Sequence, residues 1–88
     1  MTQQEITAAL DVLQELQREI MFNKTGLSLS VNQSFTPNNH REGTIDGWSV
    51  TAILHDVDGI VGRVHLARYY DTAESMKDLE QIKNIVNA

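Results

Sequence analysis

The three histidines of this sequence, His40, His55 and His65, are its most versatile side chains, because imidazole can bind a metal ion or move a proton near neutral pH. His55 and His65 lie in stretches of alternating apolar and polar residues, which predicts that both belong to one antiparallel hairpin. In the register derived below they are separated by four residues along strands that rise ~3.3 Å per residue, which is roughly 13 Å. One ion cannot bridge that distance, so we expect no metal site and no cofactor.

The other reactive side chains form no catalytic pattern. Asp56 and Asp58 resemble the start of a calcium loop, but the later ligands and the final acidic residue of such a loop are missing. The sequence has no cysteine, and its serines alternate along a strand instead of standing at a strand-to-helix elbow. It also has no glycine-rich phosphate loop and no dinucleotide fingerprint. We therefore expect a protein that is not an enzyme.

The length of the chain limits the elements that could position these residues. Eighty-eight residues predict a single domain over residues 1–88, because each half would fall near the ~40-residue limit for independent folding. A core of this size leaves a small stability margin, which makes self-association as a homodimer an open alternative. The absence of cysteine is compatible with a reducing compartment, and no signal peptide or spanning apolar run is visible. We expect a cytoplasmic protein with no membrane partner.

Helical spacing of apolar residues occurs in two stretches, residues 2–22 and 71–88. The first begins with a capping box formed by Thr2 and Glu5, and Gly26 suits the left-handed conformation that follows a helix. The second begins with Asp71 or Thr72 as its cap. The expected core positions are Ile6, Leu10, Leu13, Leu16 or Gln17, and Ile20 in the first helix, and Ala73, Met76, Leu79, Ile82 or Lys83, and Val86 in the second.

Between the helices the apolar period changes to two. Residues 27–35 alternate and predict a strand with one solvated face, and residues 36–46, with the only proline, predict a long loop. Asp56 and Gly59 suit a three-residue hairpin loop that sets Asp56 opposite Ile60. This register makes one face of the hairpin apolar. It pairs Leu54 with Gly62, Ala52 with Val64, Val50 with Leu66, and Trp48 with Arg68, the last as a cation–π pair.

The order of elements predicts an α+β fold of two layers, α-β-β-β-α, in which a three-stranded antiparallel meander has both helices packed on one face. This order resembles that of double-stranded-RNA-binding domains and of small dimeric nucleoid-associated proteins. The resemblance to RNA-binding domains implies a lysine-rich start to the last helix, but here that start reads Asp71-Thr72-Ala73-Glu74-Ser75. The net charge of −5, with seven scattered lysines and arginines, also opposes phosphate binding, and we expect no nucleic-acid partner.

The sheet face that the helices leave uncovered is the best candidate for a functional surface. It would combine apolar residues with Arg63 and two histidines, a mixture found at interfaces, although scattered apolar residues also occur on ordinary surfaces. We expect a small acidic protein-interaction domain that acts through this face or through loop 36–46, on a protein partner or on itself as a homodimer. The candidate interaction residues are Ile53, His55, Val61, Arg63, His65, Tyr69, His40 and Arg41.

Two alternative functions stay open. The acidic residues concentrate on the predicted helices, since the first carries four against Arg18 alone. Such carboxylates would imitate phosphates if the protein were an acidic decoy that inhibits a basic nucleic-acid-handling protein, as small proteins of mobile elements do. The second alternative is a small-molecule-binding domain that uses His55, Arg63 and His65.

Overall fold

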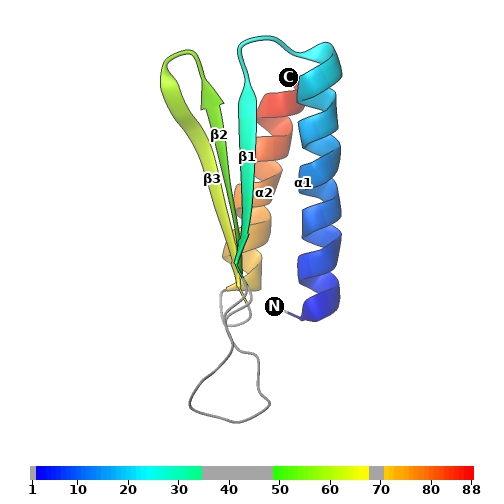
Figure 1. Cartoon of the computed structure of the whole chain (residues 1–88). Helices are drawn as coiled ribbons and strands as arrows, with labels where there is room; N and C mark the ends of the chain where they lie inside the picture. Colours follow the sequence, from blue (N-terminus) through cyan, green and yellow to red (C-terminus); the bar gives the residue numbers. More distant parts are fainter. Residues whose placement is uncertain (1, 35–48, 68–70) are drawn as a thin grey trace.

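The computed structural model describes residues 2–34, 49–67 and 71–88, and it confirms the predicted α+β fold. Two helices flank three strands along the chain (Figure 1). The elements are α1 (Gln3–Asn23), β1 (Ser28–Ser34), β2 (Ser49–Asp56), β3 (Gly59–Ala67) and α2 (Thr72–Asn87). The predicted cation–π pair of Trp48 and Arg68 and the predicted loop 36–46 lie outside the described residues.

The three strands form one antiparallel sheet in the order β1-β2-β3. The two helices lie along the same side of this sheet (Figure 1). Helix α1 packs mainly toward β1, and α2 packs mainly toward β3. In this two-layer arrangement, neither of the two described helices covers the opposite face of the sheet.

Both helix starts are fixed by side chains, as predicted. At α1 the Glu5 amide donates to the Thr2 hydroxyl over 3.1 Å, while the Thr2 amide donates to a Glu5 carboxylate oxygen over 3.0 Å. At α2 the cap is Asp71 rather than Thr72, since its carboxylate accepts from the amides of residues 73 and 74. Gly26 has a φ of +79°, but the residue that caps α1 is Lys24, two positions earlier, and its backbone is extended. Gly26 therefore turns the chain toward β1 instead of capping α1 directly.

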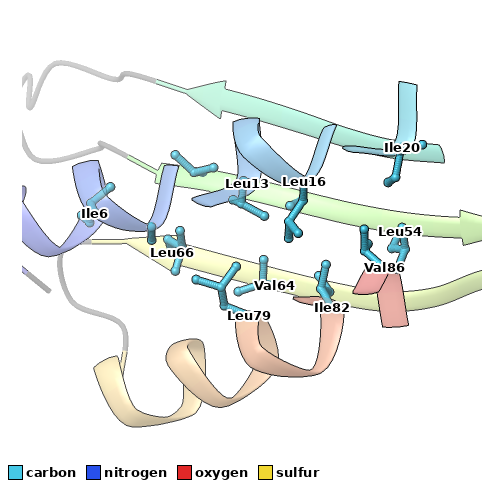
Figure 2. Packing of buried hydrophobic residues seen from close by; sticks show 13 residues of the cluster. Ile6, Leu13, Leu16, Ile20, Leu54, Val64, Leu66, Leu79, Ile82 and Val86 are labelled. Atoms are coloured by element: carbon cyan, nitrogen blue, oxygen red, sulfur yellow. The ribbon is translucent and has the colours of Figure 1, made fainter. Parts of the chain in front are cut away.

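The core lies between the helices and the sheet (Figure 2). Of the alternatives left open by the sequence, Leu16 and Ile82 are buried. Two of the predicted core positions are wrong, because Ala73 is exposed and Met76 is 43% exposed, while Ser75 takes the buried place one turn before Leu79. The buried apolar residues are Ile6, Ala9, Leu13, Leu16, Ile20, Val50, Ala52, Leu54, Val64, Leu66, Leu79, Ile82 and Val86.

The hairpin register is confirmed away from the turn and wrong at the turn. Leu54 pairs with Gly62, and the register continues as predicted toward Val50 and Leu66. At the turn, however, Asp56 pairs with Gly59 and not with Ile60, and the extra residue enters as an irregularity between Leu54 and His55. The turn is closed by the Asp58 amide, which donates to the Asp56 carboxylate over 2.7 Å. The strand pairing therefore contains a bulge one step beyond the loop.

Candidate interaction surface

We call the side of the sheet opposite the helices the open face. Along β2 the fully buried Val50, Ala52 and Leu54 alternate with half-buried residues, so the half-buried set points away from the helices. The register with β1 and β3 then assigns the neighbouring side chains. The open face carries Ser28, Ser30, Asn32 and Ser34 from β1, Ser49, Thr51, Ile53 and His55 from β2, and Ile60, Val61, Arg63, His65 and Ala67 from β3.

The bulge adds an apolar residue to the open face that the sequence did not predict. Ile60 was expected opposite Asp56, on the core side, but it pairs with His55 instead. Ile60 is 53% exposed and its neighbour Val61 is 39% exposed. Ile60 pairs with His55, two residues along β2 from Ile53, and Val61 is the unpaired residue beside it, so both lie diagonally across from half-buried Ile53. We call Ile53, Ile60 and Val61 the apolar patch.

Arg63 borders the apolar patch. It is exposed and pairs directly across the strands with Ile53. Among the described residues the ion pair that forms is Arg18 with Glu15 on α1, with 2.7 Å between nitrogen and oxygen. No carboxylate of the described chain neutralises Arg63. The patch therefore offers apolar contact beside an unpaired cation.

His65 is held in place by its neighbours. Its ring Nδ1 lies 2.8 Å from the hydroxyl of Thr51, its cross-strand partner, and its backbone carbonyl accepts a hydrogen bond from Ser75 over 2.9 Å. His55 lies four residues from Thr51 along β2, at the opposite end of the face. The two histidines are therefore separated as predicted, and the described residues contain no group of three or more potential metal ligands.

The β1 side of the open face differs from the β3 side. Its four side chains are serines and an asparagine, and all are exposed. The hydroxyls of Ser34 and Ser49 lie 3.1 Å apart across the strands. The open face is therefore polar and uncharged along β1 and apolar to cationic along β3.

Three predicted interaction residues cannot be placed on this surface. His40, Arg41 and Tyr69 lie outside the described residues, whereas the structure brings Ile53, His55, Val61, Arg63 and His65 onto one face of the sheet. Ile60 is the residue that sequence reasoning missed. Within the described ranges, no helix has the length and apolar character needed to cross a membrane.

A separate groove of about 510 Å³ lies between the helices. Val12 and Leu16 contribute apolar side chains to it, and Lys83 lies on its α2 side. Its α1 side carries three carboxylates spaced four residues apart, which are Asp11, Glu15 and Glu19. The groove involves none of His55, Arg63 and His65, so the small-molecule alternative gains no support from it and stays a prediction.

No protein-family model, curated protein or solved structure matches the chain.

Proposed function

We propose that this chain is a non-enzymatic protein-interaction domain that binds a protein partner through the open face. The observation that supports this most strongly is the apolar patch beside Arg63. Ile60 and Val61 are exposed, and the described residues give Arg63 no carboxylate partner. Binding would cover the apolar side chains and neutralise the guanidinium; apolar burial is typical of interface cores, and arginine is enriched among the residues that contribute most to binding.

The partner that fits this surface presents an apolar patch next to an aspartate or glutamate. Its carboxylate would accept a bidentate pair of hydrogen bonds from the Arg63 guanidinium, and its apolar side chains would contact Ile53, Ile60 and Val61. His55 stands beside Ile60 and would form part of the polar rim. Because β2 and β3 are already paired, binding has to order only the exposed side chains and not the backbone that carries them.

The test compares two variants of the full chain as bait in an affinity capture from the source cells, with the bound proteins identified by mass spectrometry. The face variant combines Ile60→Glu with Arg63→Glu. The control variant combines Gln81→Glu with Lys77→Glu on the exposed side of α2, and it changes the net charge by the same amount. All four positions are exposed, so both variants should keep the fold.

We expect a partner that the wild type and the control variant both capture and the face variant loses. Equal capture by the face variant would show that the open face is not the binding surface. Loss of the same partner by the control variant would point to the helices instead.

A second candidate function, the acidic decoy, is supported by a different observation. Asp11, Glu15 and Glu19 form a line of carboxylates along one side of α1; Arg18 of the same helix pairs with Glu15, and Lys83 lies across the groove. A basic segment of a nucleic-acid-handling protein would be attracted to this line. If this proposal is right, Glu15→Gln with Glu19→Gln weakens partner binding, and rising salt weakens the wild-type complex. Binding that is insensitive to both changes would exclude it.

A further inference from the structure

The outer edge of β1 exposes backbone groups that no strand of the described chain pairs. In an antiparallel strand the N–H and C=O of one residue point to the same side, and successive residues alternate. Gln17 of α1 donates its side-chain amide to the Leu29 carbonyl over 3.0 Å, so the groups of Leu29 point away from β2. Those of Val31 and Gln33 then point outward as well. We call these three residues the β1 edge.

The β1 edge lacks the features that keep edge strands from pairing. Proteins protect such edges with charged residues, proline or a bulge. The seven residues Ser28–Ser34 include no charge and no proline, and their register with β2 is unbroken over all seven pairs. The opposite edge, on β3, carries the bulge and Arg63, whereas each of the two edges has one carbonyl that accepts a hydrogen bond from a helix side chain. β1 is therefore the edge that remains ready to pair.

The part of α1 next to the β1 edge is uncharged too. Gln17 marks the side of the helix that faces this edge, and residues three and four positions away lie on the same side. Glu15 and Glu19 lie farther round the helix, toward α2. We call the uncharged residues nearest Gln17 the α1 flank. It comprises Leu10, Gln14, Gln17 and Met21, and it is bordered by Asp11 and Arg18, which lie three or four positions from its members.

We propose that a second copy of this chain pairs with the β1 edge, antiparallel and about a two-fold axis near Val31, to give a continuous six-stranded sheet. A copy fits because the seven residues of β1 carry no charge to repel themselves, although the chain as a whole has a net charge of −5. With the axis at Val31, the backbone N–H and C=O of Leu29 lie opposite those of Gln33 of the second copy. The Leu29 carbonyl, which already accepts from Gln17, would accept a second hydrogen bond there. The half-buried Leu29 and Val31 and the flank residue Leu10 would lose their remaining exposure to water.

This pairing is independent of the proposed partner binding. It uses the outer edge of β1, whereas the proposed partner site centres on Ile60 and Arg63 of β3. Because Ser30 is the cross-strand partner of Ile53 in the apolar patch, the dimer is measured on the chain alone, without a partner, and the two proposals can then be tested separately.

The test is sedimentation equilibrium of the full chain from micromolar to near-millimolar concentration. We expect the wild type to form dimers, and we expect Ser30→Lys with Asn32→Lys to weaken the dimer at least about tenfold by placing like charges across the axis. Both positions are exposed, and circular dichroism checks the fold. The matched control, Gln81→Lys with Asn84→Lys on α2, should dimerise like the wild type.

A charge-swap measurement completes the test. Mixing the lysine variant with a Ser30→Glu, Asn32→Glu variant should restore a dimer, now of unlike chains, and the amides of Leu29, Val31 and Gln33 should exchange more slowly as wild-type concentration rises. The proposal is overturned if the wild type stays monomeric throughout, if the lysine variant dimerises as well as the wild type, or if the mixture stays monomeric.

Discussion

The hydroxyl of Ser75 donates a hydrogen bond to the backbone carbonyl of His65 over 2.9 Å and ties α2 to the outer edge of β3. Gln17 of α1 makes the corresponding bond to the Leu29 carbonyl at the outer edge of β1. Each helix thus satisfies one outward carbonyl of the edge strand beside it. These two bonds help to hold both helices on the same side of the sheet, and the open face results from that placement.

Replacing Ser75 by alanine should destabilise the domain by about 1–2 kcal/mol. Ser75 is 1% exposed, so its loss leaves the His65 carbonyl without its donor in a part-buried site. Urea denaturation measures the free energy of unfolding. Ser30→Ala, at an exposed position of β1, is the control and should change stability by less than about 0.5 kcal/mol. Equal effects of the two substitutions would contradict this role of Ser75.

Gly62→Ala should destabilise the domain by about 1–3 kcal/mol through overpacking. A Cβ at this position would lie 2.9 Å from Cγ1 of Ile82 on α2. Combining it with Ile82→Ala should cost less than the sum of the single substitutions, because alanine lacks the Cγ1 atom that the new methyl group would meet. Thermal unfolding of the four proteins of this cycle measures the coupling. If the changes in unfolding free energy of the two single substitutions simply add, then Ile82 of α2 is not packed closely against Gly62 of β3.

The capping box predicts a specific pH dependence. Hydrogen bonds with the backbone and then the side chain of Thr2 lower the pKa of Glu5. Because the pKa is lower in the folded state, the contact stabilises the fold above the pKa of an unfolded glutamate, and this stabilisation is lost as pH falls through the folded-state pKa.

An NMR titration of the Glu5 carboxylate tests this prediction. Thr2→Ala removes the hydroxyl acceptor and loosens the first turn of α1, so the pKa of Glu5 should rise toward its ordinary value. Thr25→Ala, at an exposed threonine outside the helices, should leave it unchanged. An unaltered pKa in the Thr2→Ala variant would mean that the capping box does not hold in solution.

The fold could be predicted from the sequence because periodicity and capping agree along the chain. The pairing of Leu54 with Gly62 follows from the need to keep one face of the hairpin apolar, and this need sets the register along most of both strands. It does not determine whether the unpaired extra residue lies in the loop itself or in the strand next to it. The bulge was therefore not predicted, and neither was the exposure of Ile60 on the open face.

The buried face of α2 shows the other limit. Met76 has the apolar character expected of a core residue, but the position is exposed and Ser75 is buried instead. The hydroxyl of Ser75 is buried because the His65 carbonyl of β3 needs a donor there, a requirement that exists only once the helix lies on the sheet. Hydrophobic spacing alone contains no information about such a tertiary hydrogen bond.

The most direct measurement of the central claim, that the open face binds the protein partner, is methyl NMR of the isolated domain titrated with the partner identified by capture. The methyl signals of Ile53, Ile60 and Val61 should shift or broaden, while those of Leu13 and Ile82 in the core between helices and sheet should stay in place. A footprint confined to α1 and α2, with the signals of the apolar patch unchanged, would contradict the account.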